Sequence, residues 1–299
     1  MGKVLIVAGG DGIGGLMNGF QVAHYVKQAG YEVDVKLSAS NEVYYPLYHL
    51  FHDQFIMSQL PIEYSQNHRL LHDDVLLTTL TQGYEDFAYI CPDLTYKYFN
   101  YKKYNILPNT IKGTRLLTHR FNPQRQIYLA LNTTTAGYNY KHIHALLLML
   151  SSFLPQYTIY LSVLNKWSNL DVKRMELPNE LPKNVVISRD PDFIDQLDLL
   201  SQCSACICLD NGLSHIAYHL GQIRILLDPH LVGDLAWKIR WREDMADSVE
   251  LITSPANIAR ILFINLSCPE TQLLSKREVL DVIGSKNIID WKQELFLKY

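Results

Sequence analysis

Polar residues with the spacing of a ligand site follow a predicted buried strand at 205–209, in the second half of the chain. A glycine turn separates this strand from a predicted helix over 213–220, and the backbone N–H groups at the start of such a helix favour an anion. Side-chain oxygens in the turn can accept hydrogen bonds from ligand hydroxyls. The candidate ligand residues are Asp210, Asn211, Gly212, Ser214 and His215. The alternative is a purely structural turn followed by a hydrogen-bonded helix histidine.

A glycine-rich turn near the N-terminus is the second candidate for anion binding. It joins a predicted buried strand at 4–8 to a predicted helix at 16–29, and its glycines include Gly10, Gly12, Gly14 and Gly15. The spacing G-x-G-x-x-G also invites a dinucleotide cofactor, which needs an acidic residue at the end of the next strand. Asp34 lies inside that strand, at 31–37, so the sequence does not favour a nicotinamide cofactor. A tight turn that packs the helix on the sheet remains the alternative.

Alternating predicted strands and helices indicate two α/β domains, at 1–122 and 123–299. Between the first βαβ unit and residue 122 we expect loops, short helices and strands at 75–80 and 87–90. The predicted strands of the second domain are 127–132, 157–163, 184–188, 205–209, 223–227 and 249–252. Its predicted helices are 140–153, 192–202, 213–220, one starting at Ser254-Pro255, and a last segment at 288–297 that is able to cross back to the first domain.

Composition narrows the class of protein. The 299 residues carry 27 basic and 30 acidic side chains, a formal net charge of -3, so a protein-wide basic field for nucleic acid is absent. No apolar run approaches the roughly 20 residues of a membrane span. Cys203, Cys206 and Cys208 lack a second ligand pair at zinc spacing and fit buried thiols in a strand. We therefore expect a reducing, cytoplasmic compartment.

Two resemblances follow from these motifs. The segment 208–221, with Asp210, Gly212 and His215, resembles the D-[ST]-G-x-x-H-[IL]-A signature of the bacterial heptosyltransferase family, and Asn211 stands where serine or threonine is usual. The glycine turn, with Val22-Ala23-His24-Tyr25 and Gly30-Tyr31-Glu32-Val33, resembles the start of MurG-like glycosyltransferases. The resemblance implies an α/β GT-B fold, with two doubly wound Rossmann-like domains facing across a cleft.

The resemblance also implies roles for individual residues. The second domain would bind a nucleotide-sugar donor through the residues of the 210–215 turn. The loop after its first strand would contact the donor diphosphate, because threonine hydroxyls and a lysine at a helix start suit that anion. The loop residues are Thr133, Thr134 and Lys141, and Arg189 is a further candidate for the base or ribose. A solvated lysine with helix-capping threonines is the alternative.

The implied activity is transfer of a hexosyl or heptosyl group to an acceptor hydroxyl. Asp11, in the glycine turn, is the candidate base, because a carboxylate in a dry cleft can have a raised pKa. A simple turn residue is the alternative for Asp11. We find no D-x-D motif in a convincing setting for a metal site. We therefore expect no metal, and no cofactor besides the nucleotide-sugar donor. The acceptor is expected to be a saccharide or lipid-saccharide.

Two other functions stay open at the level of sequence. Residues 96–125 interleave basic and aromatic side chains, a pattern that can hold a nucleic acid, so modified DNA is an alternative acceptor. The same pattern also fits a solvated loop with core tyrosines. A catalytically inactive GT-B-like binding protein is the second possibility, because the base position departs from both families.

Overall fold

The computed structural model describes most of the predicted elements. The residues it describes are 2–9, 12–38, 41–60, 74–90, 101–104, 114–132, 140, 142–163, 177–189, 192–209, 211–227, 249–250 and 255–267. Gly10, Asp11, Thr133, Thr134, Lys141, Asp210 and the predicted segment 288–297 lie outside them. The chain forms two compact units, and the first gives way to the second between Leu116 and Leu117. The acceptor and donor roles of the two halves stay predictions.

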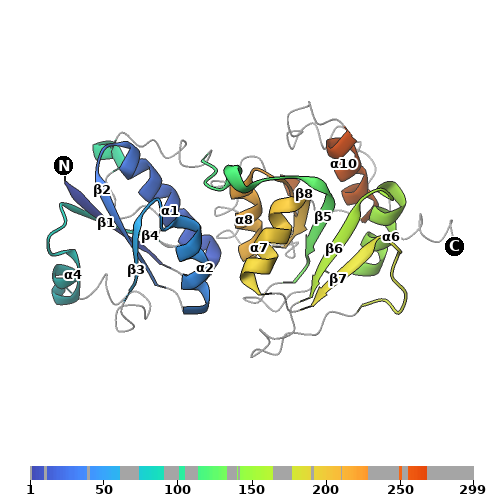
Figure 1. The fold of residues 1–299 in the computed structure, drawn as a ribbon, viewed down its shortest axis with the longest axis horizontal. Coiled ribbons are helices and arrows are strands. Elements are labelled where there is room, and N and C mark those ends of the chain that lie inside the picture. The colour runs from blue at the N-terminus through green and yellow to red at the C-terminus, as the bar shows by residue number, and fades with distance from the viewer. Residues whose placement is uncertain are drawn as a thin grey trace. The chain divides into compact units, whose positions relative to one another are not determined.

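The first unit contains a four-stranded parallel sheet in the order β3-β2-β1-β4. Its strands are β1 (Lys3–Ala8), β2 (Glu32–Leu37), β3 (Ile56–Gln59) and β4 (Asp86–Ile90). Its helices are α1 (Ile13–Gln28), α2 (Asn41–Phe51), α4 (Asp74–Thr81) and the 3-10 turns η2 (Tyr101–Tyr104). In Figure 1, α1 and α2 lie on one face of this sheet and α4 on the other. β1 is apolar along its length because both of its faces are covered.

Asp34 has a structural explanation inside β2. Its side chain forms an ion pair with Lys3 at 2.7 Å and accepts a hydrogen bond from the Tyr84 hydroxyl at 2.6 Å. Burial, together with this bond to Asp34, raises the pKa of Tyr84 to about 12. The carboxylate therefore joins β1, β2 and the start of β4, as a buried charge with hydrogen-bonding partners should.

The predicted strand at 75–80 is wrong, because this segment is the helix α4. Its valine and threonines favour a strand, but the burial pattern is helical: Leu80 is buried, while Thr78 and Thr79 next to it are both exposed. A half-buried strand would alternate instead. The Thr81 hydroxyl also donates to the Leu77 carbonyl at 2.8 Å, a bond that only a helical turn allows.

The second unit contains a six-stranded parallel sheet in the order β10-β9-β8-β5-β6-β7. Its strands are β5 (Gln124–Ala130), β6 (Thr158–Val163), β7 (Val185–Arg189), β8 (Cys203–Cys208), β9 (Ile223–Leu226) and β10 (Val249–Glu250). Its helices are η3 (Thr118–Arg120), α6 (Ile143–Phe153), α7 (Phe193–Gln202), α8 (Gly212–Leu220) and α10 (Pro255–Ser267). In Figure 1, α6 and α10 cover one face of the sheet and α7 and α8 the other. This arrangement confirms the predicted doubly wound α/β class.

Gly19 allows α1 to approach β1 closely. A Cβ atom at Gly19 would lie 2.4 Å from the Cβ of Ala8 and 3.0 Å from its Cα. A Cβ at Gly12, by contrast, would meet no atom within 4 Å. The glycine turn therefore continues into a helix whose packing on the sheet depends on Gly19, about two turns after Gly12.

Gly19→Ala is expected to lower the free energy of unfolding by about 1–2 kcal/mol in urea denaturation, because overpacking outweighs the helix propensity gained. The control is Gly12→Ala, which should change the free energy of unfolding by less than about 1 kcal/mol. A stabilised Gly19→Ala protein would contradict the close packing of α1 on β1.

Candidate functional site

The candidate ligand site is the crevice expected outside the carboxyl ends of β5 and β8, from the strand order of the second sheet. The chain leaves β5 toward β6 and β7, then returns to place β8 on the other side of β5. Ligands of open parallel sheets bind at this kind of reversal, where loops diverge from two neighbouring strand ends. The loop after β5 and the start of α8 are the two segments that the sequence predicts for donor binding. The sheet thus brings residues 130–132, where the first of these segments begins, and the start of α8 to one edge.

The side chain of Asn211 joins these two segments. Its Nδ2 donates to the carbonyl oxygens of Ala130 at 3.1 Å and Asn132 at 3.0 Å, at the end of β5. Its Oδ1 accepts from the backbone N–H of Ser214 at 3.1 Å and so caps α8. Serine or threonine, the residues of the heptosyltransferase motif, could cap α8 but could not donate twice from an amide. Asn211 therefore positions the site.

The first turn of α8 is preorganised for an anion. The Ser214 side chain is buried and its hydroxyl donates to the Asn211 carbonyl at 2.6 Å, so Ser214 supports the turn. Asn211 already accepts from the N–H of Ser214, and within the described part of the chain the N–H groups of Gly212 and Leu213 at the helix start have no acceptor. Those two amides, with the positive end of the helix dipole, suit a phosphate oxygen.

His215 is more enclosed than the sequence predicts. Its side chain is 4% exposed, and His219, one turn later on the same helix, is 2% exposed. Both imidazoles belong to the packed underside of α8. The His215 ring is buried. A direct contact between His215 and the donor stays a prediction.

Arg224 is a residue of this site that sequence reasoning missed. It lies on β9, is 4% exposed, and donates from its guanidinium to the Ser214 carbonyl at 2.9 Å. The guanidinium also lies over the Tyr218 ring, 5.2 Å from the centroid. The available signal was the arginine within the otherwise apolar strand Ile223–Leu226.

Arg189 lies away from this crevice. It ends β7, the outermost strand on its side of the sheet, and its side chain is exposed. Two strand spacings separate β7 from β5, which amounts to about 10 Å. A contact with the base or ribose would therefore require a ligand that extends across the strand ends.

The sequence comparisons identify no family: no protein-family model matches the chain, and no curated protein matches it. Several solved structures do match the chain in their fold. E. coli ADP-heptose lps heptosyltransferase II is 15% identical, covers 90% of this chain and 100% of its own, and gives a TM-score of 0.54. E. coli heptosyltransferase WaaC with ADP is 11% identical, covers 90% and 98%, and gives 0.53.

The chain has the GT-B fold. Structural matches at identities of 11 and 15% show a shared fold and do not identify the substrate. The chain spans only 58% of the dodecameric heptosyltransferase TibC, at 12% identity, 76% coverage of this chain and a TM-score of 0.48. Among the described residues, none of the helices is both long and apolar enough to cross a membrane.

The structure describes part of the glycine turn near the N-terminus, namely Gly9 and the residues from Gly12 onward. Gly12 precedes α1 in an extended conformation without a side-chain cap, and Gly14 and Gly15 are buried inside the helix. A Cβ at Gly9 would lie 2.7 Å from the hydroxyl of Tyr89, so this glycine leaves room for a side chain from β4. The open start of α1 is compatible with an anion or acceptor contact, and the role of Asp11 stays a prediction.

The cysteines of β8 belong to the core. Cys203, Cys206 and Cys208 are buried free thiols. Burial raises the pKa of Cys203 to about 12, and a hydrogen bond with Cys208, added to burial, raises that of Cys206. Within the described ranges, no three histidine, cysteine or acidic side chains gather as metal ligands would. The prediction that these cysteines are buried thiols in a strand is confirmed.

Two residues of the basic, aromatic segment at 96–125 have structural roles. Tyr104 is 3% exposed, and its hydroxyl donates to the Asp86 carboxylate. Lys103 forms ion pairs with Glu85 at 3.1 Å and Asp86 at 3.4 Å, and these neighbours raise its pKa. Both side chains therefore attach η2 to the start of β4 and the residue before it.

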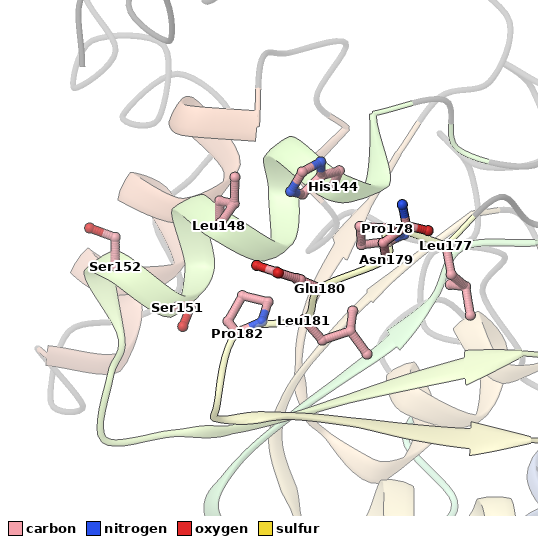
Figure 2. Close-up of a pocket in the computed structure, with 10 residues that line it drawn as sticks. All are labelled: His144, Leu148, Ser151, Ser152, Leu177, Pro178, Asn179, Glu180, Leu181 and Pro182. Carbon is pink, nitrogen blue, oxygen red and sulfur yellow. The ribbon is translucent and has the colours of Figure 1, made fainter. Parts of the chain in front are cut away.

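A hollow of about 890 Å³ lies elsewhere in the second unit. In Figure 2, one wall is α6, with His144, Leu148, Ser151 and Ser152, and the other is the segment before β7. That segment contributes Leu177, Pro178, Asn179, Glu180, Leu181 and Pro182. Because it precedes β7, it approaches the amino end of the sheet. None of the residues that line the hollow belongs to the described end of β5 or to the first turn of α8.

Asn211→Ala is expected to cost about 2 kcal/mol of unfolding free energy, because it removes the helix cap and the amide that donates to the Asn132 carbonyl, while the Ala130 carbonyl keeps the Leu209 N–H. Asn211→Ser should recover roughly half of that loss, since serine caps α8 but cannot reach the end of β5. Urea denaturation of the three proteins measures the difference. Full recovery by serine would show that the link to β5 adds nothing.

Proposed function

We propose that this protein is a glycosyltransferase that moves a sugar from a nucleotide-sugar donor to an acceptor hydroxyl. The observation that carries the proposal is the link that Asn211 makes between the end of β5 and the start of α8, where the strand order of a GT-B domain reverses. The GT-B fold alone would also suit an inactive binding protein. A crevice with a capped helix start and two open amides is what binding of the donor diphosphate requires.

The proposed chemistry is a displacement at the anomeric carbon. The acceptor oxygen forms the new bond to that carbon while the bond to the donor phosphate breaks, and a nucleoside diphosphate leaves. We propose that Asp11 takes the acceptor proton. The amides of Gly212 and Leu213, with Lys141, would stabilise the charge that develops on the leaving diphosphate. Because these groups are cationic or N–H donors, we propose that no metal is required.

The resemblance to heptosyltransferases gives the finer proposal. WaaC has been solved with ADP and with ADP-2-deoxy-2-fluoro heptose. An adenine nucleotide carrying a hexose or heptose is therefore the first donor to test here, and the proposed acceptor is a saccharide or lipid-saccharide. The buried free thiols support the expectation of a reducing, cytoplasmic compartment.

A thermal-shift screen in EDTA, with nucleoside diphosphates, nucleotide sugars and nicotinamide dinucleotides, tests this proposal. One nucleotide sugar at 100 times its Kd should stabilise the protein by about 2.7 kcal/mol. Asp210→Ala and Lys141→Ala should each reduce that shift, because both side chains are assigned to the donor. The same donor should then release its nucleoside diphosphate slowly in water and faster with an acceptor.

Lys183→Ala is the matched control for Lys141→Ala, since Lys183 is exposed just before β7 and has no assigned role. It should leave the shift unchanged. Absence of a shift with every nucleotide sugar would overturn the donor site. A shift without donor turnover would assign the chain to the inactive binding class, and a shift that needs added divalent metal would overturn metal independence.

A further inference from the structure

The hollow between α6 and the segment before β7 has walls that are fixed to each other. The side chain of Asn184, the residue before β7, donates from Nδ2 to the Tyr157 carbonyl at 2.9 Å. Its Oδ1 accepts a hydrogen bond from the Ser151 hydroxyl near the end of α6. Leu177 and Leu181 pack against the apolar core of the second unit. A ligand would therefore meet two walls that are already ordered, which lowers the entropy cost of binding.

Four exposed polar side chains face this hollow. They are His144 and Ser152 on α6, and Asn179 and Glu180 on the opposite wall. Within the described part of the chain, none of these four side chains forms a hydrogen bond or an ion pair. In Figure 2, the Glu180 side chain points from its own segment toward α6. The two walls together thus offer a ligand both hydrogen-bond donors and hydrogen-bond acceptors.

Apolar side chains form the rest of the described lining, and all of them are partly exposed. They are Leu148, Leu177, Pro178, Leu181 and Pro182. The volume of about 890 Å³ falls within the range of about 300–1,000 Å³ that is typical of small-molecule pockets. A sugar ring matches this mixture, because its edge carries hydroxyl groups while its faces present C–H groups.

The charge of the lining separates a sugar from other polar ligands. Among the described lining residues, Glu180 is the only carboxylate, and none is a lysine or an arginine. A phosphate or a nucleotide would meet this negative charge without a cation to pair with it. An amine would pair with Glu180 but would leave the N–H and O–H donors of Asn179 and Ser152 unused. A neutral ligand with several hydroxyl groups can use all of them.

We propose that this hollow binds a neutral saccharide. The inference goes beyond the proposed function, because the described lining contains none of the residues assigned to the donor or to catalysis. Binding here requires neither a nucleotide sugar nor a transfer reaction. The second unit would then hold a saccharide through α6 and the segment before β7, in addition to the proposed donor.

Saturation-transfer NMR on the full chain, without nucleotide, tests the inference. The neutral probes are methyl glucoside, cellobiose and chitobiose, and the charged probes are glucosamine and glucose 6-phosphate. At least one neutral probe should bind more tightly than both charged probes. Titration of that probe should show a loss of about tenfold in Glu180→Ala and about threefold in Asn179→Ala, because each change removes a hydrogen bond to the sugar.

Asp198→Ala is the matched control, since Asp198 is an exposed carboxylate on α7, and its affinity for the probe should equal that of the wild-type protein. Equal melting temperatures would show that all three variants are folded. Binding that survives Glu180→Ala but is lost in Asp210→Ala would place the saccharide at the proposed transfer site and overturn the inference. Tighter binding of a charged probe, or no binding of any neutral probe, would also overturn it. None of these outcomes depends on the nucleotide-sugar screen, whose failure would overturn the proposed function alone.

Discussion

The carboxamide of Asn211 is the interaction on which the candidate site depends. One side chain uses both of its N–H groups on the end of β5 and its oxygen on the first turn of α8. These segments are about 80 residues apart in the sequence, and β5 and β8 are neighbours only because the chain reverses between them. Without this link the helix start and the β5 loop would be positioned separately. A diphosphate needs both at once, so the geometry of the crevice depends on this residue.

The two faces of the second sheet differ in a way that serves this crevice. Alternate residues of β5, β6, β8 and β9 form an apolar core with α6 and α10, including Ile127, Leu129, Leu161 and Ile207. The intervening residues point toward α7 and α8 and include Tyr128, Ser162, Cys206 and Arg224. The apolar face supplies most of the burial that stabilises the unit. The other face carries the buried guanidinium of Arg224, which bonds to the Ser214 carbonyl of α8.

Most of the fold could be predicted because its strands are short, largely apolar runs bounded by turns, and because α7 and α8 begin with side-chain caps at Asp192 and Asn211. The segment at 75–80 could not, since its valine and threonines favour a strand while packing on the sheet selects a helix. The turn after β8 was found from its motif. The double link made by Asn211 and the position of Arg224 were not, because both depend on partners in other elements. Lys103, in the basic and aromatic segment at 96–125, pairs with Asp86 at the start of β4, a contact that the sequence does not show.

Hydrogen exchange with and without the selected nucleotide sugar tests the central claim, that the donor binds at the carboxyl ends of β5 and β8. The account predicts slower exchange in 131–142 and 211–216, with the largest change at the amides of Gly212 and Leu213. It predicts little change at the hollow between α6 and 177–182. Protection confined to that hollow, or to the glycine turn before α1, would place the donor elsewhere and contradict the account.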